Sequence, residues 1–188
     1  MTSPPPVRPH PDILRTDRDY HEVRVLLLIV SVSEHRPGPG HIDGLTQLAK
    51  LDFLVRHPRF AALALEEVGE EDPRLHLNAP DARAVDSPGI RHRYGPWDER
   101  YYTVVGALVG RGLIRLGEGG RSRFTLTPAP AGSRLARAAA ASPPWRPVAD
   151  RCAAVAEAAG RLSGHRLTQL ILTRLPRTRR DDLREPIR

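Results

Sequence analysis

Arginine side chains gather at two places where they could bind phosphate. Arg121 and Arg123 lie beside a glycine-rich turn, and Arg177, Arg179 and Arg180 lie near the carboxyl end of the sequence. Guanidinium groups form short, charge-assisted hydrogen bonds with phosphate oxygens, and such contacts position a protein on nucleic acid without reading its sequence. These five arginines are therefore candidate contacts to a nucleic-acid backbone.

The charge of the chain is distributed unevenly. Residues 1–118 carry 15 Lys and Arg against 17 Asp and Glu, a net of −2, whereas residues 119–188 carry 14 Arg against 5 Asp and Glu, a net of +9. A polyanion or an acidic protein surface would complement this basic part. The alternative is an ordinary solvated surface in an arginine-biased chain, in which Lys50 is the single lysine.

Motifs for catalysis or metal binding are missing from the sequence. The glycines of GPGH at 38–41 lack the Lys-Ser/Thr that completes a phosphate loop, no two histidines have HxxxH spacing, and no Gly-x-Ser-x-Gly occurs. Cys152, the only cysteine, lies in an alanine-rich predicted helix and is interpreted as a packing thiol. We predict a non-enzymatic protein with no cofactor, metal or small-molecule substrate.

A capped helix is predicted within RYGPWDERYY (93–102) and the residues that follow. Asp98 is a natural N-cap, which places Trp97 and Tyr102 at the two positions of a hydrophobic staple. Gly112 suits the left-handed residue that ends a helix, with Leu108 and Leu113 as the apolar pair of a Schellman motif. For Trp97, stacking on a ligand is the alternative to the staple.

A β-hairpin is expected after this helix. Strands are predicted at Leu113–Leu116 and Arg121–Leu126 around a turn at Gly117–Gly120, and Thr127-Pro128 is predicted to begin the next helix, with Pro at its first position. Further helices are predicted at 20–34 (for which β-branched residues favour a strand instead), 42–57, Arg59–Val68, 148–161 and 164–175, with a short strand at Gly89–Tyr94.

This order of elements predicts a mainly α fold with a small β-hairpin wing, a winged helix-turn-helix with extra C-terminal helices. The expected parts are a disordered Pro-rich arm at 1–18, the winged-helix domain at 19–141, a helical extension at 142–176 and a basic tail at 177–188. The segment 69–88, with five carboxylates and three prolines, is expected to be an exposed acidic loop.

A cytoplasmic location is expected from two features of the sequence. The longest apolar run, Val25–Val30, is far shorter than the roughly 20 residues of a membrane span, and the first residues lack the apolar stretch of a signal peptide.

The helix before the hairpin is poorly equipped to read bases. Its predicted outward residues include no Asn, Gln or Lys, the acidic residues at its start would repel phosphates, and small residues suit packing against a protein. The predicted outward set is Glu99, Arg100, Thr103, Ala107, Gly110 and Arg111.

Two further groups of charged residues are candidates for binding a protein partner. Lys50 lies close to Asp52 and Arg56, and a compact ammonium there suits an ion pair with an acidic partner or with Asp98; chance retention of one lysine in an arginine-biased chain is the alternative. Arg91 and Arg93, just before Tyr94, form a basic strip; an exposed strand face is the alternative.

Four stretches resemble one protein family. They are GLTQLAKLDFLVRHPRF (44–60), IRHRYGPWDERYYTVVGALVGRGLI (90–114), FTLTPAPAGSRLA (124–136) and, more weakly, GHRLTQLILTRLPRTRRDDLREPI (164–187). They are similar to the middle component of bacterial three-component ABC (ABC-3C) systems. The Pro-rich arm and the basic tail depart from that pattern.

The resemblance implies a winged-helix adaptor between an ABC ATPase of the structural-maintenance-of-chromosomes (SMC) class and an effector protein, in defence against phages or plasmids. The alternative is a winged-helix transcriptional regulator, which would dimerise on a palindromic operator; non-specific DNA contact is compatible with either. The residues that match the motif, and are therefore candidates for partner binding, are Lys50, Asp52, Arg93, Tyr94, Trp97, Asp98 and Tyr102. Arg91 of the basic strip is a further candidate for partner binding.

Overall fold

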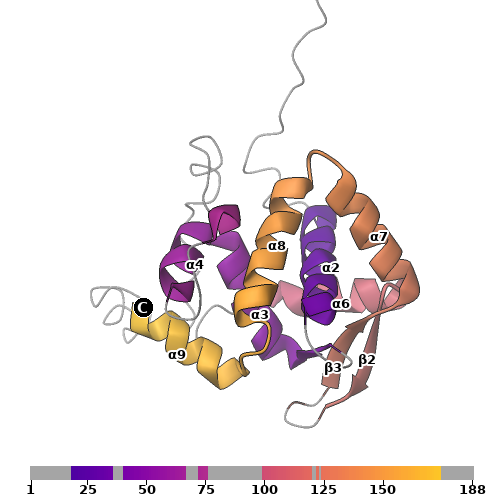
Figure 1. Ribbon diagram of the computed structural model, residues 1–188. Helices are drawn as coiled ribbons and strands as arrows, with labels where there is room; N and C mark the ends of the chain where they lie inside the picture. Colours follow the sequence, from indigo (N-terminus) through magenta and orange to yellow (C-terminus); the bar gives the residue numbers. More distant parts are fainter. Residues whose placement is uncertain are drawn as a thin grey trace, which may run out of the picture.

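The computed structural model describes residues 18–35, 40–66, 72–75, 99–119, 122 and 124–174, which form a mainly helical fold with a small three-stranded antiparallel sheet (Figure 1). The helices are α2 (Arg18–His35), α3 (Gly44–Arg56), α4 (Pro58–Leu65), α6 (Arg100–Gly110), α7 (Pro130–Ala141), α8 (Arg146–Ala159), α9 (Gly164–Arg174) and the 3-10 turn η1 (Pro73–Leu75). The strands are β1 (Ile42–Asp43), β2 (Ile114–Glu118) and β3 (Phe124–Pro128).

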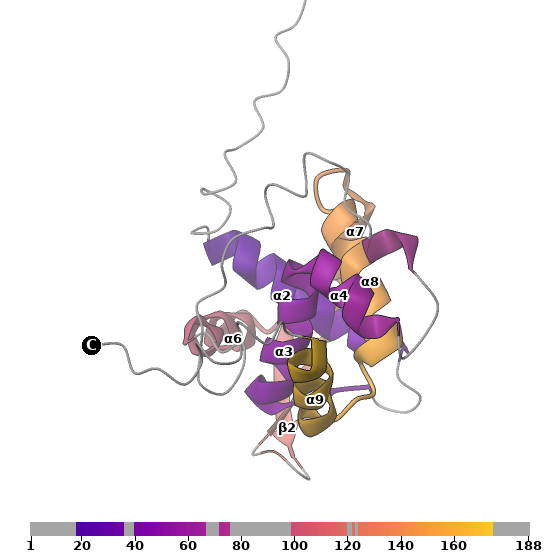
Figure 2. The ribbon, with the colours of Figure 1, turned by 90° about the vertical axis from the view of Figure 1, so that its left-hand side faces the viewer.

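Helix α2 forms the centre of the core. Every residue from Val25 to Val30 is buried, because α6, α7, α8 and β3 all pack around this helix (Figures 1 and 2). Burial on all sides explains both the continuous apolar run and the choice of helix over strand, since tertiary packing outweighs the weak strand preference of β-branched residues. The prediction of a helix here is confirmed, and Arg18, expected in the arm, is its first residue.

The C-terminal helices share this core. Val148, Cys152 and Val155 of α8 pack in the same cluster as α2, while Leu167 and Ile171 of α9 belong to it as well. Figure 2 shows α9 beside α3 and α4, on the side of the molecule away from α7. The predicted helices at 148–161 and 164–175 are therefore confirmed to within two residues at each described end.

The sheet differs from the predicted hairpin in two respects. The strand order is β1-β3-β2, so a third strand, Ile42–Asp43, pairs with β3 where a helix was expected to begin. Strand β2 runs on through Glu118, so the predicted turn at Gly117–Gly120 is wrong; Gly117 instead pairs with Thr125. The third strand depends on pairing between distant residues, Ile42 with Leu126, which local turn chemistry does not reveal.

Helix α7 begins two residues later than predicted. Pro128 is the last residue of β3, opposite Ile114, and Pro130 lies in the first turn of the helix. The ladder is extended because the Ala129 N–H donates to the Leu113 carbonyl at 2.9 Å. Gly132 then passes so close to the Leu113 carbonyl that a Cβ there would lie 2.0 Å from its oxygen.

The end of α6 is as predicted, whereas its start is not. The Leu113 N–H donates to the Leu108 carbonyl at 2.9 Å and the Gly112 N–H to the Val109 carbonyl at 2.9 Å, which are the two bonds of a Schellman motif. Gly112 has φ +66°. At the other end Glu99, not Asp98, precedes the first helical residue, and its side chain forms no capping bond.

Several predictions of structure concern residues outside the described ranges. These are the arm up to residue 17, the strand at Gly89–Tyr94, the basic tail at 177–188 and most of the acidic segment. Of that segment, residues 72–75 are described, and Leu75 is buried rather than exposed. Helix α4 ends at Leu65, before the predicted Val68. Among the described helices, none has the length and apolarity to cross a membrane.

Replacing Gly112 with Ala tests the Schellman ending. We expect Gly112→Ala to lower the free energy of unfolding by about 1 kcal/mol, because left-handed backbone disfavours a Cβ. Open space surrounds the position, so no clash contributes. The control is Gly106→Ala, also in open space but inside α6, which should raise stability by roughly 0.5–1 kcal/mol. Urea denaturation measures both, and changes of the same sign would contradict the assignment.

Candidate functional site

Helix α3 has two buried charged side chains, Lys50 and Asp52, on opposite faces. Residues two apart on a helix are separated by about 200° around its axis, so their side chains leave it on opposite faces. Lys50 is 6% exposed and Asp52 is 0% exposed. Both were candidate partner-binding residues, but in this structure each binds another part of the same chain.

Asp52 joins three helices at one buried carboxylate. Arg24 of α2 donates from Nε to Oδ1 at 2.7 Å and from Nη2 to Oδ2 at 3.0 Å, a bidentate ion pair. The hydroxyl of Tyr101, on α6, donates to Oδ2 at 2.7 Å. All three side chains are buried, so the arrangement orients α2 and α6 about α3.

The network keeps its charges despite its burial. Burial alone would raise the pKa of Asp52, but the charge and hydrogen bonds of Arg24 outweigh it and hold that pKa below its usual range. The pKa of Tyr101 is raised well above its usual value, by burial first and then by the neighbouring Asp52 charge. A neutral phenol therefore donates to an ionised carboxylate.

Lys50 and Gln47 hold the connection between α8 and α9. Lys50 Nζ donates to the Gly164 carbonyl at 2.7 Å, and Gln47 Nε2 donates to the Leu162 carbonyl at 2.7 Å. Burial lowers the pKa of Lys50. In the described structure, the ammonium of Lys50 donates to the Gly164 carbonyl. Asp98, which was predicted as an intramolecular partner of Lys50, lies outside the described residues.

Cys152 behaves as a packing thiol, as predicted. Its side chain is completely buried, with Sγ 3.9 Å from the Arg24 carbonyl oxygen. Burial raises its pKa to about 12, so the thiol is neutral and poorly nucleophilic. In the described ranges, no three His, Cys, Asp or Glu side chains are grouped to hold a metal ion.

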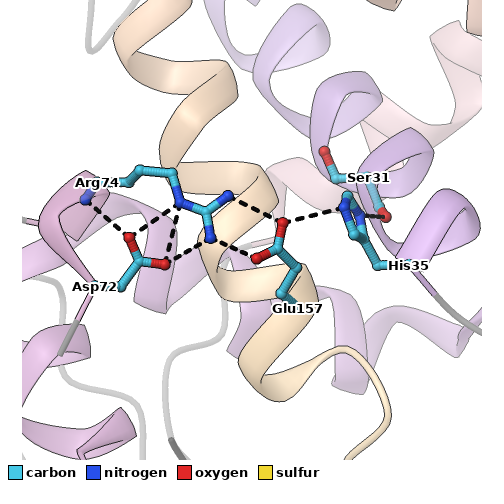
Figure 3. A network of polar contacts seen from close by, with 5 residues as sticks. All are labelled: Ser31, His35, Asp72, Arg74 and Glu157. Carbon is cyan, nitrogen blue, oxygen red and sulfur yellow. Dashed lines mark hydrogen bonds and ion pairs between the residues drawn. The ribbon is translucent and has the colours of Figure 1, made fainter. Parts of the chain in front are cut away.

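A polar network fastens the described part of the acidic segment to α8 (Figure 3). Arg74 donates from Nη1 to Glu157 at 2.9 Å, and from Nε to the two Asp72 oxygens at 3.0 and 3.1 Å. Glu157 also lies 3.1 Å from Nε2 of His35, at the end of α2. Hydrogen bonds from Arg74 lower the pKa of Glu157. Residues 72–75 of the segment predicted to be an exposed loop are therefore docked on α8, and the carboxylate of Asp72 is paired with Arg74.

The outer face of α6 offers few groups for reading bases. Arg111 donates from Nη1 to Glu22, a buried carboxylate that also accepts a 2.8 Å bond from Arg18. Ala107, predicted to point outward, is half-buried, and Tyr102 is 64% exposed. From Glu99 to Arg111, the exposed residues are Glu99, Arg100, Tyr102, Thr103, Gly106, Gly110 and Arg111.

An open groove of about 790 Å³ lies where α6 ends, beside β2 and the start of α7. Leu116 is half exposed there, and Arg115 and Arg134 bring the only charged side chains among its lining residues. The groove is lined by Val109, Gly112, Ile114, Arg115, Leu116, Ala129, Pro130, Ala131 and Arg134.

The structure places three of the predicted site residues, Lys50, Asp52 and Tyr102. It does not bring them together, since two are buried and Tyr102 is exposed on α6. The others lie outside the described residues: Arg91, Arg93, Tyr94, Trp97, Asp98, Arg121, Arg123, Arg177, Arg179 and Arg180.

The sequence prediction missed Arg24, Tyr101 and Glu22. One signal was available for Arg24, which is a charged residue between Val23 and the apolar run Val25–Val30 of α2. A charge in such a place requires a buried partner of opposite sign. Comparisons with known protein families, with characterised proteins and with solved structures give no match.

Removing the charge of Asp52 tests whether its carboxylate organises the fold. Asp52→Asn leaves Arg24 buried without a counter-ion, and we expect the free energy of unfolding to fall by about 3–5 kcal/mol. Tyr101→Phe loses one hydrogen bond to a charged acceptor and should cost roughly 1.5–3 kcal/mol. Asp150→Asn, at an exposed position of α8, is the control and should leave urea denaturation unchanged. Equal stability of Asp52→Asn and wild type would contradict the role given to this carboxylate.

The same network predicts a direction for acid sensitivity. Because the folded-state pKa of Asp52 is below its usual value, its stabilising effect is fully present above about pH 4 and is lost as the pH falls through the folded pKa. The stability difference between wild type and Asp52→Asn should therefore be constant from pH 7 to about 5 and shrink in stronger acid. Urea denaturation at several pH values measures it; a difference that widens on acidification would refute the assignment.

Proposed function

We propose that this chain is a non-enzymatic winged-helix adaptor that binds other proteins. Its partners would be an SMC-class ABC ATPase and an effector protein of a bacterial defence system, as the sequence resemblance implies. The proposal combines the resemblance with two features of the structure, the order of the elements and the composition of the exposed face of α6.

The topology supports the winged-helix part of the proposal. In a winged helix, three helices precede a β-hairpin, and a short strand after the first helix joins the hairpin as its third strand. The described order α2, β1, α3, α6, β2 and β3 follows this scheme, with α4 and η1 between the second and third helices. The antiparallel pairing of β1 with β3 fits it as well.

The observation that favours an adaptor over a sequence-specific DNA-binding protein is the composition of the outer face of α6. Specific readout needs several long donors and acceptors aimed at base edges. Among the exposed residues of this helix and its flanks, the long basic side chains are Arg100 and Arg111, and Arg111 is held by Glu22. Glu99 adds a carboxylate at the helix start, which would face phosphates.

Co-purification tests the proposal. The tagged protein is expressed with the products of its neighbouring genes and recovered in moderately high salt, which weakens contacts through phosphates and surface charges. We expect stoichiometric recovery of the ATPase, the effector or both. Recovery of the chain alone, together with tight and specific binding to its own upstream DNA, would contradict the adaptor and favour a transcriptional regulator.

A pair of variants tests whether the α6 face is the contact surface. Gly106→Arg adds a long side chain where a Cβ meets nothing within 4 Å, so the fold is preserved and only a docked partner is obstructed. We expect partner affinity to fall about tenfold or more, equivalent to about 1.4 kcal/mol. The control, Gln169→Arg, adds the same group at an exposed position of α9 and should leave recovery unchanged.

A further inference from the structure

Strand β2 is an edge strand with backbone groups available for pairing. It lies outermost in the order β1-β3-β2, and all of its residues after Ile114 are exposed. The Ala129 N–H donates to the Leu113 carbonyl, and these two residues lie opposite each other when the pairing of Ile114 with Pro128 is extended by one pair. In an antiparallel ladder, hydrogen-bonded and non-hydrogen-bonded pairs alternate. The N–H and C=O groups of Ile114, Leu116 and Glu118 therefore point away from β3.

An apolar groove accompanies this edge. Val109, Ile114 and Ala129 contribute apolar lining, and Leu116 exposes half of its surface on the strand. Proteins usually blunt exposed edge strands, because open backbone groups beside apolar side chains invite another strand. Here a large apolar residue occupies the middle of the edge, which suits an edge that pairs with a partner.

The groove is held in place by its surroundings. The Ala129 N–H fixes the start of α7 to Leu113, and Gly132 lies against the Leu113 carbonyl with no room for a Cβ. The Schellman bonds at Gly112 and Leu113 fix the end of α6 to the same connection. A site with this many backbone constraints loses little conformational entropy when a partner binds.

The charge of the groove selects the chemistry of its occupant. Arg115 and Arg134 are exposed, and neither forms an ion pair with a carboxylate within the described residues. Arg115 belongs to the strand edge and Arg134 to the first turns of α7, so the two guanidiniums border the groove from two elements. An occupant bearing Asp or Glu next to apolar residues would neutralise both.

We infer that the groove binds an extended, acidic segment of a protein partner, which pairs with β2 as an additional antiparallel or parallel strand. Main-chain hydrogen bonds to Leu116 and its neighbours supply affinity, and the two arginines supply selectivity for acidic side chains. This inference rests on the proposed function, because it names the surface by which the adaptor would hold one of its partners.

Two other occupants fit the groove less well. A second copy of the chain pairing through β2 would form an isologous contact and bring two sets of Arg115 and Arg134 together, with repulsion between like charges. A nucleic-acid backbone would satisfy the arginines, but its phosphates gain nothing from the apolar lining or from the donors and acceptors of a strand edge.

The experiment uses the full chain in complex with the co-purified neighbouring-gene product. Leu116→Pro removes an outward N–H without breaking the bonds to β3, whereas Leu116→Thr keeps that N–H and removes only the large apolar side chain. Arg115→Glu with Arg134→Glu reverses the charge of the groove. Arg166→Glu, at an exposed position of α9 that is not among the residues lining the groove, is the matched control. Dissociation constants and amide hydrogen exchange of Leu116 are measured.

We expect the double arginine variant to weaken binding about a hundredfold, Leu116→Pro to weaken it more than Leu116→Thr, and Arg166→Glu to leave it unchanged. The Leu116 amide should become protected from exchange in the complex. If a partner binds all variants equally and this amide stays unprotected, the groove is not the binding site. That result would overturn this inference and leave the adaptor function intact.

The other outcomes also decide between the ideas. Failure of the wild-type chain to bind any neighbouring-gene product would overturn the adaptor and this inference together. A homodimer that Leu116→Pro dissociates would assign the edge to a second copy, and salt-sensitive DNA binding lost in the arginine variant would assign the groove to nucleic acid. Either result would overturn the acidic-segment proposal.

Discussion

A single carboxylate without access to water constrains the arrangement of this molecule. Asp52 is completely buried, so its charge needs compensation from within the chain, and Arg24 and Tyr101 provide it from two other helices. Replacing such a network with apolar residues of similar volume is often neutral, so it is weak evidence for high stability. Its geometric effect is clearer, because three partners at fixed bond lengths allow few relative positions of α2, α3 and α6.

The inner network and the outer surface are connected through α6. Tyr101 turns inward to Asp52, while the neighbouring Tyr102 is exposed, so the direction of the outer face follows from the inner bond. At the far end of the helix, Arg111 pairs with Glu22 of α2, so its charge is compensated within the chain although the side chain stays exposed. Apart from Glu99, Arg100 and the paired Arg111, the exposed residues are small or weakly polar, a composition better suited to contact with protein than to readout of bases.

Features governed by neighbouring residues were predictable from the sequence, and features governed by distant ones were not. The Gly112 ending of α6 rests on bonds within five residues, and it was predicted correctly. Strand β1 was missed because its pairing with Leu126 spans most of the domain. Lys50 and Asp52 were singled out correctly as unusual, but whether a charged side chain faces a partner or the core depends on the packing of the other helices. Arg24 carried a usable signal, a charge between Val23 and the apolar run Val25–Val30, whereas Glu22, near the polar start of α2, carried none.

The position of Lys50 has a chemical consequence. It holds the only side-chain amine in the sequence, and that amine lies against the Gly164 carbonyl at the start of α9. Acylating reagents, and enzymes that acetylate or conjugate proteins at lysine, therefore find no accessible ε-amine on the folded chain. Reaction at Lys50 requires α9 to separate from α3, so the rate of its acylation reports the opening of that helix contact and leaves the arginine-rich surfaces chemically unchanged.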